Sequence, residues 1–149
     1  AGYGVGCKLV RIGADGKSVE TVYADNKVMK NHHGGVVLLD GKIYGHSDGA
    51  GWVCQDLVTG NEVWAFKNFG KGAIHYADGK FYCLDERSGV VALIEASDKG
   101  WKEISRFTLS PLSEKRSKQG GIWPHPVVLN GRLYLRDQEY VYCYDVKGN

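Results

Sequence analysis

Apolar and polar residues alternate over short runs of this chain, and one such pattern occurs three times. Each copy has an apolar run, an Asp-Gly or Asn-Gly pair, a basic residue, and then an apolar residue followed by tyrosine. The copies cover residues 37–45, 75–83 and 127–135. Asp-Gly and Asn-Gly between two such runs are typical of two-residue hairpin turns, because these turns need positive φ. The pattern therefore predicts three β-hairpins.

The residues around each hairpin extend it into a longer unit of short strands and turns. In residues 35–69 we expect four strands, at 35–39, 42–46, 52–57 and 62–67. A four-stranded antiparallel meander is one blade of a β-propeller. Repetition of such a unit at intervals of roughly 40 residues is typical of propellers and solenoids.

The other units follow the same plan but are incomplete at the two ends of the chain. Residues 72–109 predict a second complete blade, residues 125–146 predict the first three strands of a blade, and residues 3–24 predict the last two. The polar stretch 110–121 is interpreted as an insertion between blades. The sequence thus predicts one all-β segment over residues 1–149, a partial β-propeller of two complete and two incomplete four-stranded antiparallel blades.

Composition fits this architecture and narrows the range of functions. The 21 glycines, against only 3 prolines, suit many short strands joined by tight turns. A net charge of +2 argues against a nucleic-acid-binding surface. No stretch approaches the roughly 20 apolar residues of a membrane-spanning helix. The basic patch of Lys115, Arg116 and Lys118 is interpreted as a solvated loop rather than a phosphate site.

Four cysteines are scattered along the chain, at Cys7, Cys54, Cys83 and Cys143. They are too few for a disulfide scaffold. None belongs to a Cys-x-x-Cys pair of the kind that binds structural zinc. Because Cys54 and Cys143 occupy equivalent positions in their repeats, and such positions are usually in the core, we expect buried free thiols.

One stretch carries a more specific pattern. Residues 56–64 have the form Asp-x-x-Thr-Gly-x-x-x-Trp, directly after an apolar third strand. Gly60 permits positive φ in the turn, and Asp56 and Thr59 can cap local backbone N–H groups. Trp64 offers a wide apolar face to the neighbouring blade, and its burial is worth about 3 kcal/mol. These residues resemble the tryptophan-docking repeat of the PQQ-like (quinoprotein-type) β-propeller family, named after pyrroloquinoline quinone (PQQ).

The resemblance implies a larger parent protein. Propellers of this family usually have eight blades, and residues 123–145 look like the C-terminal blade of bacterial members. The chain is then expected to be the C-terminal segment of a periplasmic or secreted protein. Two complete and two partial blades cannot close a ring, so their apolar ends and strand edges would stay open. We therefore expect self-association, or association with the remainder of the parent propeller or with another protein.

Loops at one end of the predicted blades gather polar side chains. In a propeller, the loops before the first strand and between the second and third strands surround the mouth of the channel, and such loops often bind ligands. Asn31, Lys71 and residues 85–87 belong to these loops. The candidate ligand-binding residues are His32, His33, His46, Asp48, Arg87, Trp123, His125 and Arg136.

Several chemistries are open to these residues. His32, His33 and His46 could ligate zinc or copper, but no fixed ligand spacing supports a metal, and we favour hydrogen bonds to the loop backbone. Residues 85–87 could supply a carboxylate pair for acid–base chemistry, against which we favour a salt-bridged surface turn. Trp123 could stack on a planar ligand or make a rigid loop contact. We assign no catalytic and no metal-binding residue.

The first functional hypothesis is a non-catalytic scaffold or binding surface without a cofactor. The sequence has no Gly-x-Ser-x-Gly elbow and no glycine-rich phosphate loop. Among propellers of this family, the lipoprotein of the outer-membrane barrel assembly machinery works through contacts. The resemblance also implies an alternative, a part of a quinoprotein dehydrogenase that needs PQQ and calcium, although the adjacent Cys-Cys pair of those enzymes is missing here. A third reading is a cut or designed fragment with no activity.

Overall fold

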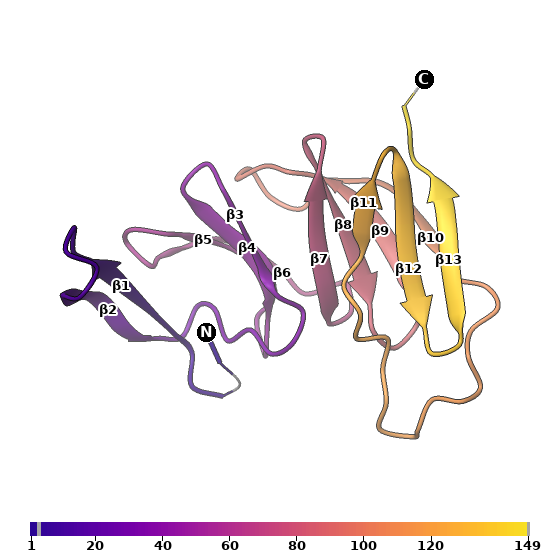
Figure 1. Cartoon of the computed structure of the whole chain (residues 1–149), viewed down its shortest axis with the longest axis horizontal. Helices are drawn as coiled ribbons and strands as arrows, with labels where there is room; N and C mark the ends of the chain where they lie inside the picture. The colour runs from indigo at the N-terminus through magenta and orange to yellow at the C-terminus, as the bar shows by residue number, and fades with distance from the viewer. Residues whose placement is uncertain (3, 149) are drawn as a thin grey trace.

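Every regular element of the chain is a β-strand in the computed structural model, which describes residues 1–2 and 4–148. Thirteen strands form four antiparallel sheets, and the strands of each sheet follow one another in chain order (Figure 1). These described ranges contain no helix, and hence none long and apolar enough to cross a membrane. The structure confirms the all-β fold and the partial propeller of two four-stranded and two incomplete blades.

The sheets lie one after another, from the indigo N-terminal sheet to the yellow C-terminal sheet (Figure 1). The first sheet contains β1 and β2, the second β3 to β6, the third β7 to β10, and the fourth β11 to β13. The strands are β1 (Cys7–Ile12), β2 (Val19–Asn26), β3 (Val36–Leu39), β4 (Lys42–Ser47), β5 (Gly51–Asp56), β6 (Glu62–Phe66), β7 (Gly72–Ala77), β8 (Lys80–Asp85), β9 (Val90–Glu95), β10 (Glu103–Thr108), β11 (Val127–Leu129), β12 (Arg132–Asp137) and β13 (Tyr140–Asp145).

Three strands begin two or more residues later than the sequence predicts. The pattern within residues 72–109 predicts a last strand from residue 101, but strand β10 begins at Glu103, because Trp101 turns into the core and stacks on Phe66 with ring centroids 4.7 Å apart. Strand β11 begins at Val127, after Pro126, which has no N–H to donate to a sheet. Strand β1 begins at Cys7; Tyr3, where the first strand was expected to start, lies outside the described residues.

The repeated hairpins have the predicted turn geometry. In each of them both turn residues have positive φ, between 48° and 73°. The flanking residues pair across the hairpin, as in Leu39 with Lys42 and Leu129 with Arg132. This geometry requires glycine at the second position and tolerates Asp or Asn at the first. The turns are Asp40-Gly41, Asp78-Gly79 and Asn130-Gly131.

The hydrophobic core lies between sheets and not within any one of them. One cluster joins the second and third sheets, where the rings of Tyr44 and Phe81 lie 4.7 Å apart. A second cluster joins the third and fourth sheets, where the rings of Phe107 and Tyr144 lie 4.7 Å apart. The second, third and fourth sheets therefore depend on one another to bury their apolar side chains.

Burial of the cysteines departs from the prediction. All four thiols are free, and Cys54 and Cys83 are buried as expected. Cys7 is half-buried, and Cys143 is exposed although it occupies the same repeat position as Cys54. Both faces of β5 are covered, so Cys54 is enclosed, whereas β13 buries only the alternate residues that face the third sheet. Cys143 lies on the other face of β13, where Arg132 Nη1 contacts its Sγ at 3.9 Å but no further described sheet packs.

The polar loop between β10 and β11 is anchored to the fourth sheet. Asp137, which is 1% exposed, accepts a hydrogen bond of 2.9 Å from the Ser113 N–H. The Arg116 Nε lies 3.2 Å from the other carboxylate oxygen of Asp137. The interpretation of the basic patch as solvated is wrong for Arg116, because a buried carboxylate needs a cation beside it. Lys115 and Lys118 are exposed, as expected.

The Asp56 turn joins β5 to β6 as its sequence predicts. The Asp56 carboxylate accepts hydrogen bonds from the Thr59 N–H at 2.8 Å and the Thr59 hydroxyl at 3.0 Å, and Lys42 Nζ lies 3.0 Å from it. The Thr59 backbone N–H, then Lys42, lower the pKa of Asp56. Gly60 has a φ of 75°. The turn places Trp64 on the side of the second sheet that packs against the third sheet.

Trp64 links two neighbouring blades. Its indole packs on the cluster between the second and third sheets, and its Nε1 donates a hydrogen bond of 3.2 Å to the Ser97 carbonyl in the third sheet's β9–β10 connection. We expect Trp64→Ala to lower the free energy of unfolding by about 3 kcal/mol, because it removes a large apolar contact between blades. Urea unfolding followed by far-ultraviolet circular dichroism would measure the change.

The matched control is Trp123→Ala, since Trp123 is 51% exposed. This change should cost less than about 0.5 kcal/mol. Equal effects of the two substitutions would contradict the role given to Trp64.

Candidate functional site

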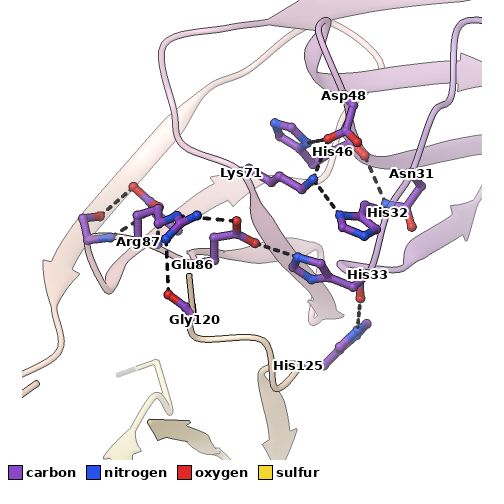
Figure 2. A network of polar contacts seen from close by, with 12 residues as sticks. Asn31, His32, His33, His46, Asp48, Lys71, Glu86, Arg87, Gly120 and His125 are labelled. Carbon is purple, nitrogen blue, oxygen red and sulfur yellow. Dashed lines mark hydrogen bonds and ion pairs between the residues drawn. The ribbon is translucent and has the colours of Figure 1, made fainter. Parts of the chain in front are cut away.

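Loops at one end of the blades bring most of the candidate residues together (Figure 2). The β2–β3 connection carries His32 and His33, and the β4–β5 loop carries Asp48. The connection between β6 and β7, the β8–β9 turn and the β10–β11 loop supply further polar side chains from the next two blades. The site is therefore assembled across blades, at the end opposite the Asp-Gly and Asn-Gly turns.

Asn31 fixes the path of the β2–β3 connection. Its side-chain amide is buried and donates to the carbonyls of Gly35, at 2.9 Å, and His46, at 3.0 Å. The Lys30 N–H donates to the Ser47 hydroxyl at 2.9 Å, which ties the same segment to β4. These contacts hold the two histidines that follow Asn31 at the junction of the second and third sheets.

Lys71 is the centre of the first group of charges. Its Nζ lies 2.7 Å from Asp48 Oδ1 and 2.9 Å from His32 Nδ1. His46 Nδ1 lies 3.9 Å from the same Asp48 oxygen. The lysine thus connects a loop of the second blade with the connection that precedes it, and it provides the compensating positive charge for Asp48 (Figure 2).

Glu86 is the centre of the second group. Its side chain is only 9% exposed, and its Oε2 lies 2.7 Å from His33 Nε2. Its backbone is also fixed, because its N–H donates to the Lys71 carbonyl at 2.9 Å and its carbonyl accepts from the Ile122 N–H at 2.8 Å. Arg87 Nε lies 4.0 Å from Glu86 Oε1. Burial lowers the pKa of His33, and the facing Glu86 carboxylate opposes that shift.

Trp123 and His125 cover the outer side of this group. The Trp123 ring lies 5.7 Å from the His33 ring, and 51% of Trp123 is exposed. His125 Nε2 lies 2.9 Å from the His33 carbonyl. Arg87 is exposed and donates to the Gly120 carbonyl at 3.3 Å. The result is an exposed rim formed by Trp123, His125 and the cationic Arg87, next to the buried carboxylate of Glu86.

The structure brings seven of the eight candidates into or beside these two groups. The exception is Arg136, whose Nε donates to the Gln138 carbonyl of its own β12–β13 turn. Three further residues hold the groups together, namely Asn31, Lys71 and Glu86. All three lie in the loops that the repeat pattern predicts at this end, but position along a loop gives no sign of which side chains meet across blades.

Two interpretations of the polar residues change. The favoured salt-bridged surface turn at residues 85–87 is wrong for Glu86, which is buried. Asp85 instead caps the turn by accepting hydrogen bonds from the Arg87 N–H at 2.9 Å and the Ser88 hydroxyl at 2.6 Å. The favoured backbone contact is also wrong for His33, whose ring Nε2 lies 2.7 Å from Glu86 Oε2. The His32 ring lies beside Lys71, with its Nδ1 2.9 Å from the lysine Nζ. Among residues 1–2 and 4–148, no group of three or more His, Cys, Asp or Glu side chains could hold a metal ion.

His46 makes the stability of this end sensitive to pH. Burial beside Trp52 lowers its pKa to about 4, and Asp48 only partly opposes the shift. In the unfolded chain a histidine has a pKa of about 6.5. Between these values the unfolded state takes up a proton that the folded state does not, so the stability is complete above about pH 6.5 and falls as the pH drops toward about 4.

We expect His46→Gln to flatten this decline, which amounts to at most about 3 kcal/mol. Thermal unfolding measured across the same pH range, together with a nuclear magnetic resonance titration of the His46 ring, tests it. Above about pH 7.5 the two proteins should show equal pH dependence, because position 46 binds no proton in either state. A His46 ring that titrates near pH 6.5 in the folded protein would contradict the prediction.

Comparison with known proteins identifies the fold. No protein-family model and no curated protein matches the sequence. BamB from Moraxella catarrhalis matches the structure with a TM-score of 0.59 and 20% identity, over 91% of this chain and 36% of that one. The quinohemoprotein alcohol dehydrogenase from Comamonas testosteroni has a TM-score of 0.57 and 17% identity, over 81% of this chain and 20% of that one.

A europium-containing methanol dehydrogenase is similar to the same degree, with a TM-score of 0.57 and 17% identity, over 81% of this chain and 24% of that one. The chain therefore spans between 20% and 36% of the length of these three proteins. At such low identity the likeness concerns the fold alone. The chain has the fold of part of a β-propeller, which it shares with these three proteins.

Proposed function

We propose that this chain is a non-catalytic propeller segment that binds a protein partner through the loop end described above. The observation that carries this proposal is the exposed Trp123. Its ring lies against His33, which in turn is held by the buried Glu86. A large aromatic side chain held rigidly at a surface can bury apolar area on binding at little entropic cost. Arg87 and His125 extend the same rim.

The composition of the rim supports a protein partner over a small substrate. Tryptophan and arginine are the residues most enriched at the centres of protein interfaces. The carboxylates Asp48 and Glu86 are occupied by Lys71 and His33, so they hold the loops together. What the loop end offers to a partner is therefore an aromatic surface with one exposed cation, Arg87, beside it.

The alternative is a part of a PQQ-dependent dehydrogenase, and the structural neighbours include proteins of that kind as well as BamB. The donor set of this chain fits the cofactor and its calcium poorly. Calcium prefers several carboxylate, amide and carbonyl oxygens around one point. Here Asp48 and Glu86 belong to two separate groups, each beside its own cation or histidine. We therefore propose that the chain itself binds neither PQQ nor calcium.

Exposed apolar faces on the second and fourth sheets support association with further polypeptide. The outer face of the fourth sheet exposes Val127, Leu129 and Val141, at 46%, 58% and 69%. Strand β3 exposes Val36 and Leu38 on the side where a preceding blade would supply two inner strands. We propose that these faces are covered by a second copy, by the rest of a parent propeller or by a protein partner. The resemblance of the repeats supports a periplasmic or secreted location.

The native mass of the purified chain tests the coverage of these faces. We expect it to exceed the mass of one chain, because apolar sheet faces of this kind associate in water. Val141→Lys should shift the distribution toward the single chain, whereas Val58→Lys, at an exposed turn, should leave it unchanged. A stable, monodisperse single chain would contradict self-association.

Photo-crosslinking tests the proposed binding surface. A benzoylphenylalanine at position 123 should capture one defined protein from the cells that make this chain, and the same group at position 58, at the opposite end of the blade, should not capture it. Arg87→Glu should weaken the capture, because it reverses the charge of the rim. Equal capture from positions 123 and 58 would contradict the proposed surface.

A separate assay tests the dehydrogenase alternative. The chain is titrated with PQQ and calcium, and dye-linked oxidation of alcohols and sugars is followed. We expect neither a saturable change in PQQ absorbance nor activity. Saturable PQQ-dependent oxidation would overturn the non-catalytic proposal, whatever the crosslinking shows.

A further inference from the structure

A cavity of about 770 Å³ lies between the third and fourth sheets, far from the loop end. It opens beside the Asp78-Gly79 and Asn130-Gly131 turns, at the other end of the blades. Its walls are mainly apolar, and the charged residues that line it are Asp78, Lys80, Asp145 and Lys147. No part of the proposed loop-end function uses it.

The register of the repeats explains why this cavity exists. In the second sheet Tyr44 pairs with Cys54, and Cys54 pairs with Trp64. These three residues form a column across the strands of the second sheet. The corresponding column of the third sheet is Tyr82, Leu93 and Ser105, which pair in the same order. Ser105 therefore stands where the preceding blade has Trp64, and all three residues of the second column line the cavity.

The facing blade is also smaller at this junction. At the preceding junction the ring centroids of Phe81 and Tyr44 lie 4.7 Å apart. Phe81 stands two residues after its hairpin glycine, and the residue at that place in the fourth sheet is Leu133. Tyr76, which pairs with Phe81, corresponds to Val128, which pairs with Leu133. Both smaller residues line the cavity. Three large aromatic side chains are thus replaced by small ones around one space.

The hydrogen-bond acceptor for an indole is retained. At the filled junction the Trp64 Nε1 donates to the Ser97 carbonyl. Ser97 follows Ala96, whose N–H donates to the Gly79 carbonyl, and in the fourth sheet the Val146 N–H donates to the Gly131 carbonyl in the same way. The residue equivalent to Ser97 is therefore Lys147, which lines the cavity. Its carbonyl is placed to accept the hydrogen bond that Ser97 accepts.

We propose that this cavity binds a tryptophan side chain of a partner polypeptide, in the way that Trp64 occupies the preceding junction. The space is large enough for an indole together with a length of backbone, and pockets of this size enclose most of such a ligand. The lining includes two acidic and two basic residues, which matches a neutral peptide better than an ion of either sign. Strand β10 beside it is the edge strand of its sheet, with backbone groups open to a peptide.

The test uses the full chain and a blocked Gly-Ser-Trp-Ser-Gly peptide that contains 5-fluorotryptophan, observed by fluorine magnetic resonance. We expect saturable binding, and loss of it when the tryptophan of the peptide is replaced by alanine. Ser105→Trp fills the space from within and should weaken binding by at least about tenfold. Ser105→Ala leaves the space open and should keep the affinity within about twofold.

If Ser105→Trp does not fold, the methyl resonances of the wild-type chain still show where the peptide binds. Binding should shift the methyl groups of Leu93, Val128 and Leu133 and leave those of Val36 and Leu38 unchanged. Binding that survives in folded Ser105→Trp, or shifts confined to the loop end, would overturn the proposal. Failure of the wild-type chain to bind the peptide would also overturn the proposal. Equal affinity for the peptide and for free 5-fluoroindole would overturn it too, because the cavity would then be a small-molecule site.

Discussion

Face-to-face packing of neighbouring sheets is the constraint on which the rest of this structure depends. No sheet encloses a core of its own, and the two buried clusters lie at junctions between blades. The packing has a consistent form, in which a tyrosine of the second strand meets an aromatic or apolar residue of the next blade, as Tyr44 meets Phe81. Apolar area removed from water is the main favourable contribution to folding, so the second, third and fourth sheets stabilise one another where they pack together.

The same packing decides where chemistry can occur. Because the blades lie side by side, loops that are far apart in the sequence meet at one end, and His33 of the connection before β3 reaches Glu86 of the following blade. The buried carboxylate and the lysine at position 71 act as fixed points that hold the rim in place. At the other end, the size of the side chains between blades decides whether a junction is filled, as it is by Trp64, or open, as it is at Ser105.

The periodic part of the sequence predicts the fold well, and the reasons are local. Asp40-Gly41 and its two equivalents specify the hairpin turns through their φ angles alone, and alternation on either side specifies the strands. The Asp56 turn is likewise determined by residues close in sequence. Where the prediction fails, the cause is a contact between distant residues. Cys143 is exposed because no described sheet packs on the outer face of β13, and Glu86 is buried because a histidine of another loop lies against it.

The candidate site was predictable only as a set of loops. Hairpin counting placed the histidines, Asp48 and Arg87 at one end, but it could not pair Lys71 with Asp48 or exclude Arg136, because pairing depends on the angle between blades. The inter-blade cavity was beyond the sequence for a similar reason. Ser105 becomes informative only when the strand register aligns it with Trp64, and the bulge in β10 shifts that register.

The most direct test of blade-on-blade packing is a measurement of proton–proton nuclear Overhauser contacts between aromatic rings of adjacent blades. This account predicts contacts between the rings of Tyr44 and Phe81 and between those of Phe107 and Tyr144, whose centroids are 4.7 Å apart in both cases. Absence of both contacts in the folded chain, with these rings instead exposed to solvent or in contact with the first sheet, would contradict packing between adjacent blades.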